Sequence, residues 1–238
     1  MRFSNRDYAE FYDRQQRDAG YPGALLPPVI SELDGFRRVI DIGAGTGFFA
    51  IPLAGAGHMV TAVEPSREMS LVMQGKCSPE VSGRISVVNE KWESWTGEFH
   101  DAAICVHSIY PMDDPVKGIS LMLASAGKRI IIVRETSGMK SLPGTVRKIL
   151  DIELNRDFNP LIVSALKGFR TEYRFINVRE ERDHLIRDID EETGAILYQL
   201  KLDPSWRGRI SEIVNGLCER IEGSLVFRAL YSDNIYVF

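Results

Sequence analysis

The stretch at residues 38–65 reads RVIDIGAGTGFFAIPLAGAGHMVTAVEP, and it decides the fold of the chain. A short β-branched run is broken by Gly43, Gly45 and Gly47, an apolar segment follows, and a second apolar run ends at Glu64. These features give the order strand, glycine turn, helix, strand and acid. The stretch therefore predicts a ligand-binding β-α-β unit.

The glycines and the acid indicate the kind of ligand. A strand that turns directly into a helix needs backbone conformations that are costly for other residues, and a ligand that touches the backbone needs the Cβ atom removed. The first turn of the following helix offers free N–H groups. Glu64 comes at the end of the second strand, where a carboxylate can accept both hydroxyl groups of a ribose. Together these features predict a ligand that contains a nucleoside.

Two nucleoside ligands compete for this turn. A dinucleotide fingerprint places glycines at the first, third and sixth positions, but the sixth position counted from Gly43 is Phe48. Asp41 precedes the turn, where an anion is poorly placed beside a diphosphate and well placed beside an ammonium group. The turn therefore favours an adenosine with a cationic amino-acid tail over a dinucleotide.

The composition is that of an ordinary globular protein. The chain has 238 residues, of which 44% are hydrophobic and 26% charged, and no apolar run approaches the roughly 18 to 20 residues of a membrane span. Residues 1–20 are dense with charge and contain no leader pattern, so we expect a cytoplasmic protein without a membrane partner. The formal charge of −4 gives no general attraction for phosphate backbones, which argues against a nucleic-acid partner.

The cysteines and histidines indicate neither disulfides nor a metal. Cys77, Cys105 and Cys218 are far apart and odd in number, which predicts reduced thiols rather than a disulfide framework or a structural zinc site. No pair among the 4 histidines has the spacing of metal ligands.

Apolar runs continue to alternate with helical segments after the first unit. Residues 84–88, 101–106 and 128–133 are short apolar runs, typical of strands that are buried on both faces. This alternation predicts an α/β fold with a doubly wound, mostly parallel sheet and right-handed crossovers.

The second half of the chain has a different pattern. Residues 173–179 alternate like a strand, and residues 183–200 and 204–221 are predicted to be helical. Residues 225–238 are interpreted as two strand runs around a turn at Ser232-Asp233-Asn234.

We expect one domain over residues 1–238. Aromatic residues lie among charged ones in residues 5–18, which indicates an amphipathic helix whose aromatic side either packs into the core or covers the ligand pocket as part of an N-terminal helical lid over residues 1–33. Residues 138–222 are expected to form a helical decoration that roofs the pocket and selects the substrate.

The sequence VIDIGAGTG at residues 39–47 resembles the first motif of the class I S-adenosylmethionine-dependent methyltransferases, and Glu64 in VTAVEPSREM is similar to their second motif. The resemblance is to the broad, type 11-like group that acts on small molecules. It implies a Rossmann-like sheet of seven strands with an antiparallel C-terminal strand and helical cap elements. It also implies S-adenosylmethionine as cofactor, S-adenosylhomocysteine as product, and a small-molecule acceptor whose identity the motifs do not give.

The resemblance assigns roles to individual residues. It implies that Asp41, Gly43 and Gly45 line the methionine part of the cofactor, and that Glu64 holds the ribose. Trp92 either forms a wall for the adenine or fills a gap in the core. The implied cofactor-binding residues are Asp41, Gly43, Ala44, Gly45, Gly47, Glu64, Pro65, Met69, Glu90, Lys91, Trp92 and His107.

His107 and Tyr110 are the candidate catalytic residues. His107 follows the fourth predicted strand, at the carboxyl edge where parallel sheets bind ligands, and its imidazole can take a proton from an acceptor. The alternative is a histidine that only packs against the cofactor, and Tyr110 has the same ambiguity. We expect direct in-line displacement at the sulfonium methyl group, to which proximity and orientation contribute about 7 to 11 kcal/mol.

Other functions stay open at this point. A sensor or scaffold that binds the cofactor without transferring a group would carry the same turn, whereas an NAD(P)-dependent oxidoreductase is disfavoured by Phe48. Nucleic-acid amino-methylating enzymes of this family often carry Asn-Pro-Pro-Tyr, but residues 107–110 read HSIY. A protein or RNA acceptor is still possible, and the sequence does not indicate the oligomeric state.

Overall fold

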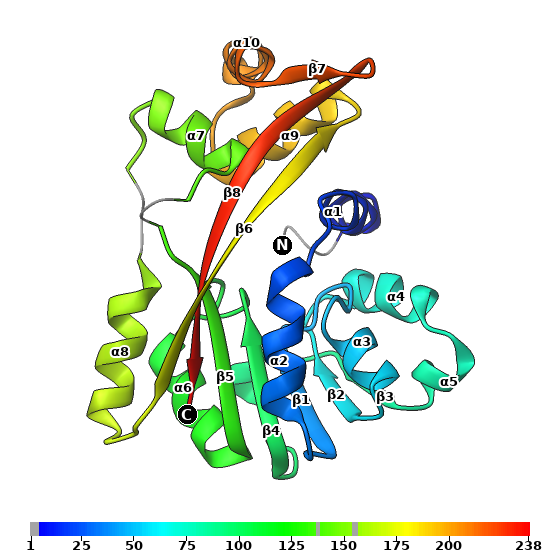
Figure 1. Ribbon diagram of the computed structural model, residues 1–238, viewed down its shortest axis with the longest axis vertical. Coiled ribbons are helices and arrows are strands. Elements are labelled where there is room, and N and C mark those ends of the chain that lie inside the picture. The colour runs from blue at the N-terminus through cyan, green and yellow to red at the C-terminus, as the bar shows by residue number, and fades with distance from the viewer. Residues whose placement is uncertain (1–4, 137–138, 154–156) are drawn as a thin grey trace.

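An eight-stranded sheet lies at the centre of the computed structural model, which describes residues 5–136, 139–153 and 157–238 (Figure 1). The strand order is β3-β2-β1-β4-β5-β8-β6, and the short β7 pairs with β8 outside this path. The strands are β1 (Arg38–Ile42), β2 (Met59–Val63), β3 (Ile85–Val88), β4 (His100–Val106), β5 (Ala126–Arg134), β6 (Arg174–Ile186), β7 (Glu219–Ile221) and β8 (Ser224–Val237).

Strands β1 to β5 are parallel to one another, whereas β8 runs antiparallel to β5 and β6. The apolar runs of β1 and β4 are buried nearly throughout, as strands covered on both faces must be. The predicted mostly parallel, doubly wound sheet with an antiparallel C-terminal strand is therefore confirmed. Seven strands follow this path, which is the number that the resemblance implies, and β7 is added to them among the described residues.

Helices cover both faces of this sheet. Val39 and Ile40 are neighbours on β1, but they belong to different apolar clusters, because side chains alternate between the faces of a strand. Val39 shares its cluster with residues of α2 and α3, and Ile40 shares its cluster with residues of α6 and α8. The helices are α1 (Arg6–Asp18), α2 (Leu26–Leu33), α3 (Ala50–Gly55), α4 (Arg67–Lys76), α5 (Pro79–Ser82), α6 (Pro115–Ser125), α7 (Leu142–Ile149), α8 (Phe158–Gly168), α9 (Ile189–Leu200) and α10 (Arg207–Leu217), with short 3-10 turns at Gly23–Leu25, Trp92–Ser94 and Pro204–Trp206.

Strands β6 and β8 extend as a two-stranded ribbon beyond the ends of β4 and β5 (Figure 1). Helices α7, α9 and α10 pack on this ribbon around a third apolar cluster, which includes Val146, Ile196, Ile210 and Phe227. We call this unit of ribbon end and three helices the cap.

The ribbon corrects two expectations for the second half of the chain. The helix predicted from Asp183 begins only at Ile189, because His184 and Ile186 continue the alternating burial of β6. The turn predicted at residues 232–234 is wrong, since β8 runs through it without a break. Two of its polar side chains pair across the sheet, since Asn177 Nδ2 donates to Asn234 Oδ1 at 2.8 Å and to Ser232 Oγ at 3.1 Å.

Helix α1 lies between the sheet domain and the cap. It begins after Asn5, whose side-chain oxygen accepts hydrogen bonds from the N–H groups of the first turn. Its Ala9 packs against Met69 of α4, and Arg14 donates two hydrogen bonds to Glu191 of α9, at 2.7 and 2.8 Å. This position fits the expected lid over residues 1–33, whose function stays a prediction.

Some parts of the expected elements are not covered by the structure. Residues 1–4 of the N-terminal segment and residues 138 and 154–156 of the helical decoration lie outside the described residues. Within the described residues, no helix combines the length and apolar character that crossing a membrane requires.

Candidate active site

The glycine turn follows β1 and brings the backbone close to neighbouring elements. Gly43 has a φ of +69°, and a Cβ atom there would lie 2.3 Å from Cβ of Ser108, so no other residue fits without movement. Gly45 has a φ of +56°, but only the Gly43 carbonyl lies near its missing Cβ, at 4.0 Å. The turn is therefore tight at Gly43 and open at Gly45.

Glu64 ties the glycine turn to the end of β2. Its two carboxylate oxygens accept hydrogen bonds from the N–H groups of Gly45 and Ser66, at 2.9 and 2.8 Å. Burial raises the pKa of Glu64, and these two N–H groups act in the opposite direction. Each carboxylate oxygen has a second lone pair, so the predicted contact with ribose hydroxyls is still chemically available.

Two buried polar atoms in this region have no hydrogen-bond partner among the described residues. They are Oδ2 of Asp41, whose residue is 3% exposed, and Oγ1 of Thr46, whose residue is 1% exposed. Burial raises the pKa of Asp41 to about 7, and the Glu64 carboxylate adds to this increase. Because a buried polar atom without a partner is costly, both atoms fit a ligand that supplies a cationic donor and a hydrogen-bond acceptor.

Asp41 and Thr46 line one small cavity. Its volume is about 40 Å³, far below the roughly 300–1,000 Å³ of a typical small-molecule site. Side chains that fill the space must therefore move to admit a nucleoside ligand. The residues around the cavity are Tyr12, Tyr21, Asp41, Gly43, Ala44, Gly45, Thr46, Phe48, Phe49 and Val106.

Tyr21 is a site residue that the sequence interpretation missed. Its ring lines the small cavity, with its centroid 5.2 Å from that of Phe48 and 6.2 Å from that of His107, so it contacts both the cavity and the first residue after β4. Arg182 of β6 holds the adjacent backbone, since its Nη2 donates to the Pro22 carbonyl at 3.0 Å. No local signal around Tyr21 points to this position, because the contact depends on β6.

His107 and Tyr110 lie together at the carboxyl end of β4. Nδ1 of His107 is 3.4 Å from the Tyr110 hydroxyl, which also accepts a hydrogen bond from the Arg134 N–H group at 2.7 Å. Burial lowers the pKa of His107 well below its usual range, and the Arg134 and Arg182 guanidinium groups lower it further. Burial likewise raises the pKa of Tyr110. At neutral pH both side chains are therefore uncharged.

A buried ion pair between β5 and β8 completes this region. Arg134 Nη1 contacts Asp233 Oδ2 at 2.6 Å, and the Arg134 guanidinium also lies 4.5 Å from the centre of the Tyr231 ring. The other oxygen of Asp233 is 3.5 Å from His107 Nε2, and neither of these two atoms has a hydrogen-bond partner among the described residues. Asp233 is not among the residues predicted for the site, because residues 232–234 have the composition of a turn.

The remaining predicted cofactor residues lie around the turn but do not line the small cavity. Met69 is buried against α1, and Pro65 is exposed. Trp92 is 3% exposed, and its Nε1 donates to the Gly118 carbonyl at 2.9 Å, so it fills the core beneath α6. Gly47 lies near Met73, and Glu90 is half-buried. Lys91 is exposed and forms an ion pair with Asp113. The other two residues, Glu64 and His107, are described above.

Comparison with known proteins identifies the central part of the chain. Residues 39–125 match the family model described as a methyltransferase domain. A predicted methyltransferase of Geobacillus sp. (strain WCH70) is 30% identical over 77 residues, which are 31% of each chain. The matched region thus spans about a third of that relative's length.

Solved structures resemble the chain over most of its length. A predicted methyltransferase of Bacillus halodurans C-125 is 11% identical with a TM-score of 0.61, and the match covers 90% of this chain and 98% of that chain. Magnesium protoporphyrin IX methyltransferase of Synechocystis PCC 6803, solved with bound S-adenosylhomocysteine, is 16% identical with a TM-score of 0.55, covering 97% and 96%. The phosphoethanolamine N-methyltransferase 2 of Haemonchus contortus, solved with phosphomonomethylethanolamine and S-adenosylhomocysteine, is 16% identical with a TM-score of 0.57, covering 98% and 57%. At these identities the likeness establishes the fold.

Proposed function

We propose that this chain, a class I methyltransferase by its fold and by the domain at residues 39–125, transfers a methyl group from S-adenosylmethionine to a small molecule. The observation that carries the proposal is the pair of unpartnered buried atoms, Asp41 Oδ2 and Thr46 Oγ1, on the glycine turn. An amino-acid tail satisfies both, because its ammonium group donates to Asp41 and its carboxylate accepts from Thr46.

Each part of the cofactor has a proposed residue to hold it. Asp41 and Thr46 bind the amino-acid tail, and Glu64 accepts the ribose hydroxyls with its remaining lone pairs. The family resemblance also assigns Glu90 and the Lys91 N–H group to the adenine. When bound, S-adenosylmethionine supplies a sulfonium methyl group that a nucleophile can displace directly.

The protein contributes to the rate mainly by positioning the reactants and by excluding water. His107 and Tyr110 are uncharged and half-buried, their rings stack on each other, and His107 lies beside Tyr21, so they offer the acceptor a wall of uncharged rings. A histidine whose pKa is well below its usual range is a weak base, which favours orientation over proton abstraction as the source of the rate.

The cap and α1 are the proposed substrate-selecting parts of a single domain. The ribbon of β6 and β8 brings Arg182, Tyr231 and Asp233 to the same region as His107, and α1 connects this region to α4. An enclosed site of this kind supports a small acceptor over a nucleic acid. Because the cysteines of the structure are free, we also propose that the protein works in the reducing cytoplasm.

Calorimetry with S-adenosylhomocysteine tests the proposal directly. We expect the wild-type protein to bind it and the Thr46→Val variant, which keeps the shape and removes the hydroxyl, to bind about tenfold more weakly. Absence of binding to the wild type, or binding of NADH in its place, would overturn the proposal. Incubation with labelled S-adenosylmethionine and a metabolite extract then finds the acceptor. Intact binding with repeated absence of any labelled product would identify a sensor instead.

Replacing His107 separates packing from proton transfer. The residue has a φ of +54°, so His107→Asn is the suitable change, because asparagine tolerates this backbone conformation. We expect kcat, measured with the acceptor found in the extract, to fall by about tenfold, with S-adenosylhomocysteine affinity within about twofold of wild type. A general base contributes about 10²–10⁴-fold, so a loss of kcat of that size at unchanged affinity, with loss of the acidic limb of the pH profile, would assign proton abstraction to His107.

A further inference from the structure

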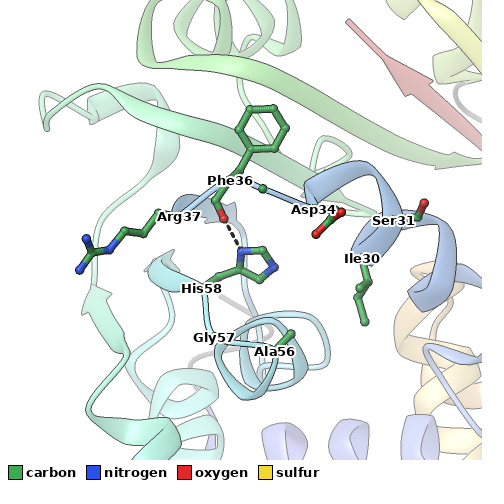
Figure 2. A pocket seen from close by; sticks show the side chains of 9 residues that line it. Ile30, Ser31, Asp34, Phe36, Arg37, Ala56, Gly57 and His58 are labelled. Atoms are coloured by element: carbon green, nitrogen blue, oxygen red, sulfur yellow. Dashed lines mark hydrogen bonds between the residues drawn. The ribbon is translucent and has the colours of Figure 1, made fainter.

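The geometry points to a binding site for a small organic cation in a second cavity, which lies at the amino ends of β1 and β2 (Figure 2). The segment between α2 and β1 and the turn between α3 and β2 form it, whereas the glycine turn follows the carboxyl end of β1. Its volume is about 550 Å³, within the range of roughly 300–1,000 Å³ that small-molecule sites occupy. The proposed methyl transfer makes no use of this cavity.

His58 presents a hydrogen-bond acceptor to the cavity. The residue is 8% exposed, and its Nδ1 lies 2.8 Å from the carbonyl oxygen of Phe36. A carbonyl oxygen only accepts, so Nδ1 carries the hydrogen and Nε2 of the neutral ring keeps its lone pair. Nε2 has no hydrogen-bond partner among the residues that the structure describes, and Figure 2 shows it facing the open space.

Asp34 adds a negative charge to the same space. Figure 2 shows its carboxylate directed toward the cavity, and the described part of the chain gives it neither an ion pair nor a hydrogen bond. Asp34 directly follows the last residue of α2, so the partial negative charge at the carboxyl end of that helix lies beside it. The rim residue Arg37 is directed away from the cavity in the same view.

The chemistry of the ligand follows from these inward-facing groups. A carboxylate, an imidazole lone pair and a helix carboxyl end all favour a positively charged N–H donor, while Ile30 and Ala56 offer apolar surface for a short alkyl chain. No group of three metal-ligating side chains occurs in the described residues, so the cation is organic rather than a metal ion. An alkylammonium or alkylguanidinium compound fits this description.

Four probes with the same alkyl chain test the assignment. We expect n-butylammonium and n-butylguanidinium to bind with dissociation constants of about 1 mM in calorimetry. Both should also shift the His58 imidazole resonances in histidine-selective NMR. Neutral n-butanol and anionic pentanoate carry the same butyl chain without the positive charge, and we expect them to leave those resonances in place. Saturation with S-adenosylhomocysteine should change neither result, because the cofactor site lies at the other end of β1.

Two substitutions that each remove one negative charge, a test variant and a matched control, examine the role of Asp34. Asp34→Asn keeps the size of an exposed side chain and should weaken the binding of both cations by at least tenfold. Glu222→Gln, in the exposed turn between β7 and β8, removes the same charge far from the cavity and should leave the affinity unchanged. Equal binding of butanol, unchanged affinity in Asp34→Asn, or displacement of the cations by S-adenosylhomocysteine would each overturn the assignment. Because the readout is direct binding, it does not depend on methyl transfer.

Discussion

Replacing Asp41 with asparagine is expected to weaken the binding of S-adenosylhomocysteine by about 100-fold, equivalent to about 2.7 kcal/mol. The variant keeps the shape of the side chain but removes the negative charge that the ammonium group of the ligand needs. Removing one partner of a buried, hydrogen-bonded charge pair typically costs about 2–5 kcal/mol. Calorimetry measures the effect, and Asp101→Asn, which changes a carboxylate at the opposite end of β4, serves as control because it lies away from the turn.

The pH dependence of binding distinguishes the charge from the shape. The pKa of Asp41 is raised to about 7, so below this pH the free site holds a proton that the ligand must displace. Wild-type affinity should therefore rise between about pH 5.5 and pH 7 and then level off, while Asp41→Asn should show no such rise. An affinity of the variant equal to that of the wild type at pH 7.5 would remove Asp41 from the cofactor site.

The same substitution is expected to stabilise the protein without ligand. The folded pKa of Asp41, about 7, exceeds its ordinary value of 3.8, so its contribution to stability is present below about pH 4 and is lost as pH rises through 7. Asparagine does not titrate and avoids this loss. At pH 7.5 we expect Asp41→Asn to raise the free energy of unfolding by on the order of 2 to 4 kcal/mol, measured by urea denaturation. At pH 4 the difference should nearly vanish.

Replacing Gly43 with alanine is expected to cost about 2 to 5 kcal/mol of folding free energy and to abolish cofactor binding. Two effects add: a φ of +69° costs a residue with a side chain about 1–2 kcal/mol, and the new Cβ would meet Ser108 Cβ at 2.3 Å. Urea denaturation and calorimetry with S-adenosylhomocysteine give the two readouts.

Two further variants separate these effects. Gly45→Ala meets only a carbonyl at 4.0 Å, so it should carry the backbone cost of about 1–2 kcal/mol without the steric cost. Adding Ser108→Gly to Gly43→Ala removes the clash, and the double-mutant cycle should yield a coupling of about 1–3 kcal/mol. Equal costs for Gly43→Ala and Gly45→Ala, with no coupling to Ser108, would contradict the close approach at Gly43.

The residues proposed to hold the cofactor could be grouped from the sequence because they are close together in the chain. Asp41, Gly43 and Glu64 belong to one β-α-β unit, in which the glycine turn sets the local geometry and parallel pairing brings the ends of β1 and β2 together. Thr46 belongs to the same motif and was overlooked because a threonine after glycines carries no distinctive signal until its burial is known.

The region proposed to face the acceptor could not be predicted because it depends on long-range pairing. Asp233 reaches Arg134 only through the register of β8 on β5, and residues 232–234 have the composition of a turn. Tyr21 is held by Arg182, which is far away in the chain. Trp92 shows the same limit, since its place in the core depends on the Gly118 carbonyl of α6.

The separate core of the cap has an evolutionary consequence. Its apolar cluster, which includes Val146, Ile196 and Phe227, is distinct from the two clusters that flank the sheet. Substitutions in distant clusters tend to add independently, so changes inside the cap need not disturb the packing beneath the glycine turn. Under the proposed role of the cap, the chain can therefore change its acceptor while the residues proposed to hold the methyl donor stay in place. Substitutions in the cap can accumulate and give new specificities, while selection keeps the glycine turn and the sheet beneath it unchanged.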